Sequence, residues 1–315
     1  MKIVYMGTPD FAVESLDALL NAGHQIVGVI TMPDKPAGRG QQLRPSPVKV
    51  FAEQKGLKIL QPQSLKDEAF LNELRDLHAD IQVVVAFRML PEVVWAMPKF
   101  GTINIHASLL PDYRGAAPIN WAIINGDKKT GVSSFLLKHD IDTGDIIFQE
   151  STDILDSDDA GTIHDRLMHL GAQLAVKTVD AIEHGTATFH KQDNIDPASL
   201  KKAPKIFKQD MKIDWSRNAT DIINLIRGLS PYPAAWTTFS DEKGNDVTAK
   251  IFKARKSDNA HLEPGQVKIV NGKVLLIGTA DSPIEVEDLQ LSGKKRMPAD
   301  ALLRGFHIDE CAKCH

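Results

Sequence analysis

The chain has 315 residues, which exceeds the usual length of one domain, so two domains with separate hydrophobic cores are expected. Hydrophobic residues make up 43% and charged residues 25%, a balance that argues against a disordered, fibrous or disulfide-built protein. The formal net charge is only -4, so nucleic acid would have to bind through local basic patches rather than an overall basic surface.

The location of the protein is predicted from what the sequence lacks. It has no apolar run near the roughly 20 residues of a membrane helix, and its start does not resemble a signal peptide. The two cysteines, Cys311 and Cys314, lie in the last five residues, so we expect a reducing, cytoplasmic compartment. With His307 and His315 they could ligate zinc, but a structural zinc site normally draws on two separated segments, so we expect a mobile tail without metal.

Short β-rich runs alternate with amphipathic stretches in the first half of the chain. This alternation predicts an α/β, Rossmann-like domain with a mostly parallel sheet covered by helices on both faces. After the first strand we expect a helix capped by Thr8, with Pro9 at its first position and Gly23 at its end. The predicted strands are 2–6, 25–30, 81–87, 102–106, 132–137 and 146–149, and further helices are 118–124 and 162–184.

Residues 31–49 interrupt this pattern with TMPDKPAGRGQQLRPSPVK. The segment is too rich in proline and glycine for a regular element, so we expect an exposed, mobile loop. Long surface loops in compact α/β units serve binding more often than packing, although a tolerated insertion remains the simpler alternative.

The composition becomes polar between Gly185 and Ile213, which indicates a linker. We predict a catalytic domain at 1–186, a linker at 187–206 and a C-terminal domain at 207–315. After a helix at 219–228, five short alternating segments predict a small, OB-like β-barrel. These segments are WTTF, VTAKIF, GQVKIV, KVLLIG and IEVEDLQL.

Three functional side-chain types converge shortly after the middle of the first domain. Asn104 and His106 are separated by one residue on a predicted strand, so both project from the same face. An amide can stabilise a developing oxyanion, and an imidazole can relay a proton beside a carboxylate such as Asp142. A backbone-bonded histidine and a turn aspartate would be ordinary structural residues separately, but their joint presence with Asn104 predicts a catalytic trio.

The segment NIHASLLPDYRGAAP at 104–118, followed by DIDTGD at 140–145, resembles the folate-dependent formyltransferase superfamily. The resemblance implies a Rossmann-like formyltransferase domain in which Asn104, His106 and Asp142 are the catalytic residues. It further implies 10-formyltetrahydrofolate as the co-substrate, with no metal and no covalent enzyme intermediate.

Three further segments resemble the branch of that superfamily that formylates methionyl-tRNA. They are MGTPDFAV at 6–13, PDKPAGRGQ with PSPVK within 33–49, and GKKRM at 293–297. The resemblance implies formyl transfer to the α-amino group of methionine on initiator tRNA, which supplies translation initiation. The implied partners are that tRNA and folate, without a membrane or an obligate protein partner.

The same resemblance assigns candidate binding residues. In the family the loop after the second strand enters the acceptor stem, so Lys35, Arg39 and Arg44 are expected to contact tRNA. Lys201 and Lys205 in the linker could continue a track for the RNA backbone, although a solvated charged surface explains them equally well. The expected folate-binding residues are Phe87, Arg88, Met89, Leu90, Ser108, Leu109, Leu110, Pro111 and Asp140. Arg88 and Met89 depart from the small and apolar residues of the family, which affects the expected pocket contacts but not the chemistry.

Three other functions are alternatives to this one. A formyltransferase acting on a nucleotide sugar or other small amine would share the trio, but it would not explain the basic loop together with a C-terminal barrel. A nicotinamide dehydrogenase would share the Rossmann-like fold, yet the turn after the first strand begins Gly7-Thr-Pro-Asp and lacks GxGxxG. A non-catalytic tRNA-binding protein would have no use for an intact trio.

Overall fold

A computed structural model of the chain describes residues 1–37, 42–192, 196, 198–240, 246–258, 261–305 and 313–315. The chain folds into two compact units, the first formed by 1–115, 130–152 and 164–202 and the second by 116–129, 153–163 and 203–315. The second unit thus takes two segments from the range 1–186, and the domain limits at 186 and 207 stay a prediction. Within the described part of the chain, no helix has the length and apolar character needed to cross a membrane.

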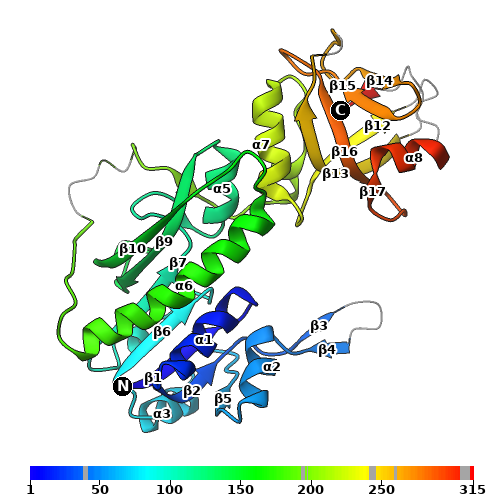
Figure 1. Cartoon of the computed structure of the whole chain (residues 1–315). Coiled ribbons are helices and arrows are strands. Elements are labelled where there is room, and N and C mark those ends of the chain that lie inside the picture. The colour runs from blue at the N-terminus through cyan, green and yellow to red at the C-terminus, as the bar shows by residue number, and fades with distance from the viewer. Residues whose placement is uncertain (38–41, 193–195, 197, 241–245, 259–260, 306–312) are drawn as a thin grey trace. The chain divides into compact units, whose positions relative to one another are not determined.

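The first unit is built on a seven-stranded sheet in the order β10-β9-β7-β6-β1-β2-β5 (Figure 1). β1 pairs in parallel with β2 and β6, and β6 with β7, whereas β9 runs antiparallel to β7. The predicted mostly parallel α/β sheet is therefore confirmed. The strands are β1 Lys2–Gly7, β2 Gln25–Ile30, β5 Ile59–Leu60, β6 Ile81–Val85, β7 Thr102–His106, β9 Lys129–Leu136 and β10 Ile146–Asp153.

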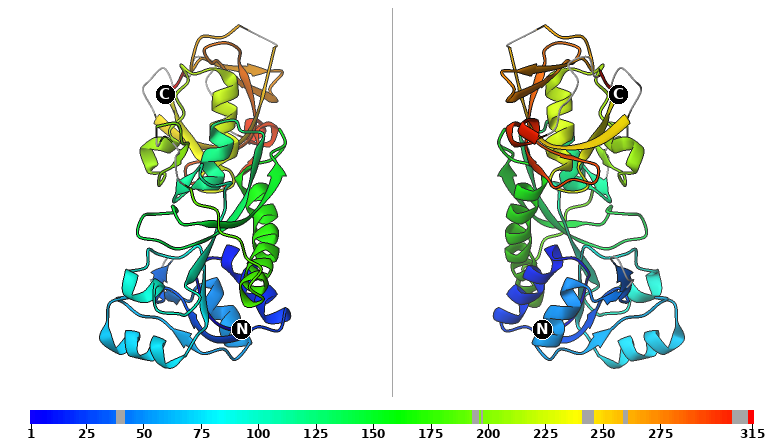
Figure 2. Two further views of the ribbon diagram at one scale, coloured as in Figure 1. Left: turned by 90° about the vertical axis from the view of Figure 1, so that its left-hand side faces the viewer. Right: turned by 90° about the vertical axis from the view of Figure 1, so that its right-hand side faces the viewer.

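Alternating residues of β1 pack against helices on opposite faces of the sheet. The buried Tyr5 donates its hydroxyl to the carbonyl of Ala12 in α1, and α6 lies along the same face (Figures 1 and 2). Met6 points the other way, into a cluster with Phe70 of α3 and Val94 of α4. The helices of this unit are α1 Phe11–Asn21, α2 Pro47–Gln54, α3 Glu68–Asp76, α4 Glu92–Trp95 and α6 Ala160–Glu183.

Two local predictions are wrong. The cap of α1 is Asp10, whose carboxylate accepts a hydrogen bond from the Phe11 N–H at 2.9 Å, so Thr8 and Pro9 precede the helix. Residues 31–49 contain regular structure, because β3 (Lys35–Ala37) pairs antiparallel with β4 (Gln42–Arg44) and α2 begins at Pro47. A proline at the first turn of a helix costs no hydrogen bond, and Ser46 caps α2 by accepting from the Lys49 N–H.

The second unit is a nearly closed antiparallel barrel, as the OB-like prediction expected. Its strands follow the order β14-β15-β16-β13-β12-β18, with β17 paired to β16. A bridge between Gln266 and Lys313 brings the two edges of this sheet together. The five predicted strands are β12 Ala235–Ser240, β13 Asp246–Lys256, β14 Val267–Val270, β15 Val274–Ile277 and β16 Ile284–Leu291; β17 Met297–Pro298 and β18 Lys313–Cys314 were not predicted.

Helices complete the second unit. Asn120 of α5 donates from Nδ2 to the carbonyl of Gly228 in α7 at 2.7 Å, and this close approach joins the segment 116–129 to the unit. The core beneath α7 includes Trp215, Ile222 and Leu289. The helices are α5 Pro118–Ile124, the 3₁₀ helix η1 Lys208–Met211, α7 Ala219–Leu229 and α8 Ala299–Gly305. Two short strands, β8 Arg114–Gly115 and β11 Lys202–Ala203, lie at points where the chain passes from the first unit to the second.

Candidate active site

The strand β7 positions the first two residues of the predicted trio. Asn104 and His106 alternate with the buried Ile103 and Ile105, so the two polar side chains share one face of the sheet. Asn104 is half-buried, and no described residue hydrogen-bonds its side chain. Its amide therefore has two N–H donors to offer a ligand.

His106 is held by the loop that follows β7. Its Nε2 lies 2.9 Å from the carbonyl oxygen of Tyr113, which can only accept, so the neutral ring must carry its proton on Nε2. Nδ1 then keeps its lone pair and lies 3.9 Å from Oδ2 of Asp142. The structure thus brings together His106 and Asp142, which are 36 positions apart in the sequence.

Asp142 lies in the turn between β9 and β10. Its Oδ2 accepts a hydrogen bond from the Gly115 N–H at 2.9 Å, and its side chain is only 13% exposed. Asp142 has a φ of 55°, a left-handed conformation that aspartate tolerates better than most residues. The Gly115 contact ties this turn to the loop after β7, so both loops contribute to one site.

Gly144 permits the tight path of the same turn. A Cβ atom at this position would lie 1.5 Å from the carbonyl oxygen of Leu136, which no side chain can accommodate. The glycine of the DIDTGD motif is therefore required by the close approach of two backbone segments.

Two polar residues that were not predicted from the sequence, the buried Ser133 and the exposed Gln149, fasten the loop after β7. Ser133 of β9 donates to the carbonyl of Ser108 at 2.6 Å and accepts from the Leu110 N–H at 3.0 Å. Gln149 of β10 donates to the Leu110 carbonyl at 2.9 Å and to the Ser133 hydroxyl at 2.8 Å. The sequence offered one signal for Ser133, which is that the predicted strand 132–137 contains two adjacent serines, Ser133 and Ser134.

The predicted folate-binding residues differ in exposure. Leu90, Ser108 and Leu110 are buried, and the Ser108 hydroxyl donates to the carbonyl of Asp112. Arg88 donates to the carbonyls of Pro62 and Gln63, and burial lowers the pKa of its guanidinium. Met89 and Asp140 are exposed, and Phe87, Leu109 and Pro111 are half-buried.

Two of the predicted tRNA-binding residues face each other on the β3–β4 hairpin. Lys35 pairs with Arg44 in the antiparallel register, and both side chains are exposed. Asp34 anchors the base of the hairpin, because its carboxylate accepts from Lys49 Nζ at 2.6 Å and from Gln61 Nε2 at 2.8 Å. Lys49 is therefore already paired. Arg39 lies outside the described residues.

The two predicted tRNA-binding lysines of the linker lie over aromatic rings, and the last residues of the chain are partly buried. Lys201 lies over the Tyr113 ring at 5.8 Å and Lys205 over the Phe207 ring at 5.6 Å, and both lysines are exposed. Cys314 is buried in β18, so the prediction of a free tail is wrong for residues 313–315. His307 and Cys311 lie outside the described residues.

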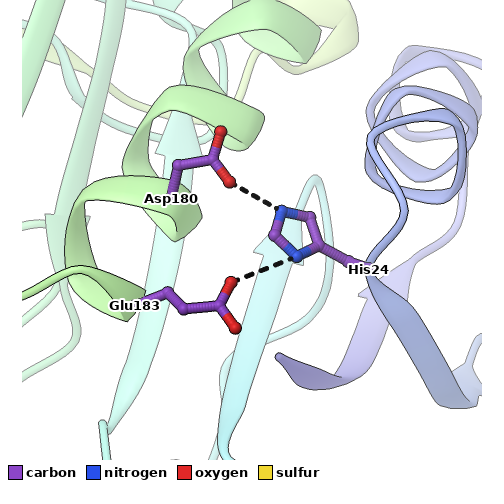
Figure 3. Close-up of side chains that lie close together, drawn as sticks. All are labelled: His24, Asp180 and Glu183. Atoms are coloured by element: carbon purple, nitrogen blue, oxygen red, sulfur yellow. Dashed lines mark ion pairs between the residues drawn. The ribbon is translucent and has the colours of Figure 1, made fainter.

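A second cluster of titratable groups lies in the first unit. The buried ring of His24 places Nε2 3.1 Å from Oδ1 of Asp180 and Nδ1 3.7 Å from Oε2 of Glu183 (Figure 3). Each nitrogen of the ring thus faces a different carboxylate. The cluster joins the end of α6 to the turn before β2.

Family models match both parts of the chain. The model described as formyl transferase matches residues 1–179, and the model described as formyl transferase, C-terminal domain, matches residues 205–307. Together they cover most of the sequence. The chain belongs to the formyl transferase family.

Curated formyltransferases resemble the chain over almost its whole length. The methionyl-tRNA formyltransferase of Bacteroides fragilis is 53% identical over 315 residues, 99% of this chain and 97% of the relative. That of Parabacteroides distasonis is 54% identical over 310 residues, 97% of this chain and 96% of the relative. That of Flavobacterium johnsoniae is 49% identical over 318 residues and covers 100% of this chain and 99% of the relative.

Solved formyltransferase structures share the fold. An N-formyltransferase from Helicobacter canadensis, in complex with folinic acid and dTDP-3-aminofucose, has a TM-score of 0.65 at 23% identity and covers 91% of this chain and 98% of its own. HypX from Aquifex aeolicus, in complex with tetrahydrofolic acid, has a TM-score of 0.61 at 16% identity and covers 96% of this chain and 47% of its own. At these identities the likeness establishes the fold of this formyltransferase and not its substrate.

Proposed function

We propose that this formyltransferase moves the formyl group of 10-formyltetrahydrofolate to the α-amino group of methionyl-initiator tRNA, in the cytoplasm. The observation that supports it most is the 53% identity to a curated methionyl-tRNA formyltransferase over 99% of the chain. At that identity the similarity extends across both family domains, including the C-terminal one.

The chemistry would be direct acyl transfer. The neutral α-amine attacks the formyl carbon, a C–N bond forms, and the carbonyl oxygen becomes an oxyanion that the Asn104 amide can stabilise. The ammonium proton passes to Nδ1 of His106, whose lone pair is available because Nε2–H is bonded to Tyr113. His106 then returns that proton to N10 of the folate as the C–N10 bond breaks, so the protons balance without a covalent enzyme intermediate.

Asp142 would stabilise the charged state of His106 between these two proton transfers. Its carboxylate lies 3.9 Å from Nδ1 and is fixed by the Gly115 N–H. A carboxylate at that distance attracts the positive charge of the transient imidazolium, which lowers the energy of the intermediate state.

The folate would bind beside β7. The half-buried Leu109 and Pro111 next to His106, with Phe87 and Met89 after β6, offer apolar surface for a pteridine ring and its linker. Folinic acid and tetrahydrofolic acid are present in the two solved neighbours. Arg88, engaged with two backbone carbonyls, would shape this surface rather than donate freely to the ligand.

The tRNA would bind through local basic surface, since the chain has a net charge of -4. Lys35 and Arg44 lie side by side on a hairpin, where two cations can contact neighbouring phosphates. Lys201 and Lys205 add exposed positive charge on the segment that leads to the second unit. Binding by such charges weakens as salt rises.

The deciding experiment compares acceptors. Purified protein with 10-formyltetrahydrofolate is offered methionine charged on initiator tRNA, methionine charged on elongator tRNA, and dTDP-amino sugars. Formylation of the initiator alone, lost in the Asn104→Ala variant, is the expected result. Transfer to an amino sugar and to neither tRNA would replace the proposal with a sugar formyltransferase.

A further inference from the structure

Gln192, in the segment after α6, makes three side-chain hydrogen bonds that join the two loops of the candidate active site. Its Nε2 donates to the carbonyl of Asp142 at 3.0 Å and to that of Gly144 at 2.7 Å. Its Oε1 accepts from Nη2 of Arg114 at 2.7 Å. Arg114 directly precedes Gly115, whose N–H binds the Asp142 carboxylate.

The turn that carries Asp142 needs such support. Asp142 has a φ of 55°, and Gly144 packs so closely on Leu136 that a Cβ would clash with backbone. A backbone in this conformation is maintained only when surrounding contacts hold it. Gln192 supplies donors to two of its carbonyls.

The backbone near Gln192 is itself fixed to the sheet. The N–H groups of His190 and Ile146 each donate to the other's carbonyl at 2.8 Å. Ile146 begins β10, immediately after the turn that Gln192 binds. The segment 190–192 therefore follows the start of β10, and its glutamine reaches back over the turn from a defined position.

We propose that Gln192 is a positioning residue for formyl transfer, holding Asp142 at its distance from Nδ1 of His106 by clamping the turn 142–144 to Arg114. The inference rests on the proposed function, because it assumes that His106 and Asp142 take part in the reaction. Gln192 itself acts through these groups and does not touch the reacting atoms.

The chemistry of glutamine is specific to this role. One amide supplies two donors for the carbonyls and one acceptor for the guanidinium. Glutamate has the same shape and can still pair with Arg114, but it cannot donate to the carbonyls of Asp142 and Gly144 at neutral pH. Gln192→Glu therefore removes the clamp with little change in side-chain volume.

The kinetic test measures kcat and KM for both substrates in Gln192→Glu and Gln192→Ala, with Gln173→Ala on the exposed face of α6 as the matched control. We expect kcat to fall about 10- to 100-fold in both variants, because small displacements of reacting groups slow catalysis strongly. KM should change less than about threefold, as for loss of an interaction that matters in the transition state. A kcat within twofold of wild type in both variants, at unchanged melting temperature, would overturn the proposal.

A double variant separates positioning from a purely structural role. If Gln192 works through Asp142, then adding Gln192→Glu to Asp142→Ala should cost less than about twofold in kcat. A structural defect that lowers the folded fraction would multiply with the Asp142 loss. Independent, multiplying losses would contradict positioning through Asp142.

Hydrogen exchange tests the clamp without any substrate. We expect amides in the segment 140–145 to exchange faster in Gln192→Glu than in wild type, while those of β7 remain unchanged. If the wild type formylated no acceptor, this result would still hold and the proposed function alone would fail. Unchanged exchange in 140–145 would overturn the clamp even in an active enzyme.

Discussion

Nδ1 of His106 and Oδ2 of Asp142 lie 3.9 Å apart, which is the separation of an ion pair and not of a hydrogen bond. Because Nε2 is bonded to the Tyr113 carbonyl, any proton that the ring accepts must reside on Nδ1, facing this carboxylate. In the proposed reaction, the pair would therefore stabilise the positive charge that the imidazole gains. It adds little while the imidazole is neutral.

Replacing Asp142 should therefore slow the chemical step more than it destabilises the protein. For Asp142→Asn we expect kcat to fall ~100-fold, within the range for groups that assist proton transfer, because the transient imidazolium loses its counter-charge. Asp156→Asn, at an exposed ion pair with Lys128, is the control and should keep wild-type kcat. Steady-state formylation of methionyl-tRNA measures kcat, and a kcat above half of wild type would contradict the prediction.

Asn104 makes a separate prediction because its amide has no partner among the described residues. Asn104→Ala removes the donor for the oxyanion, so we expect kcat to fall ~10²- to 10³-fold with little change in KM. The thermal midpoint should hardly change, since no internal hydrogen bond is lost. Asn21→Ala, at the exposed end of α1, is the matched control. A clear fall in the thermal midpoint that accompanies the loss of kcat would show that Asn104 is structural.

The sequence predicted those parts of the fold and of the candidate site that depend on hydrophobic periodicity or on short motifs. β2, β7, α5 and β16 have the predicted limits, because each is a run of consistent periodicity. The catalytic trio could be predicted because its residue types lie in motifs. The contacts that hold the trio could not, because Ser133, Gln149 and Gln192 act through partners that are distant in sequence.

The composition of residues 31–49 was also insufficient to predict the β3–β4 hairpin. The abundance of proline and glycine in 31–49 correctly indicated surface exposure but concealed β3, β4 and the start of α2. Proline is compatible with a hairpin edge and with the first turn of a helix, so composition alone could not decide. The fixing contacts, from Lys49 and Gln61 to Asp34, are again between separated positions.

Charge reversal on this hairpin should weaken tRNA binding. Lys35→Glu and Arg44→Glu each replace an exposed cation with an anion, so we expect weaker binding and a salt slope smaller by about 1 per lost phosphate contact. kcat at saturating tRNA should fall much less than the affinity. Lys66→Glu, an exposed lysine before α3, is the control with the same change in net charge. If Lys66→Glu lost as much tRNA affinity as the hairpin variants, the effect would come from net charge alone.

The buried thiol of Cys314 predicts both reactivity and pH dependence. Burial raises the pKa of this thiol, and the hydrogen bond with Thr237 opposes the shift only in part. In a Cys311→Ser background, iodoacetamide at pH 8 should therefore alkylate the folded protein at least ~100-fold more slowly than the urea-unfolded chain, since the thiolate is the reactive form. Peptide mass spectrometry measures the rate, and equal rates would show that β18 does not bury the thiol.

The same shift fixes the sign of a stability effect. A group whose pKa is raised by folding contributes fully below its unfolded value, ~8.5 for a thiol, and its contribution is lost as pH rises above that value. Between pH 8 and 9.5 this linkage should cost about 1 kcal/mol of unfolding free energy. Cys314→Ala has no thiol to ionise at this position. Its free energy of unfolding, measured in urea, should therefore fall by that much less than that of the wild type over the same pH interval. An identical decline in the two proteins would mean that the thiol titrates alike in the folded and unfolded states.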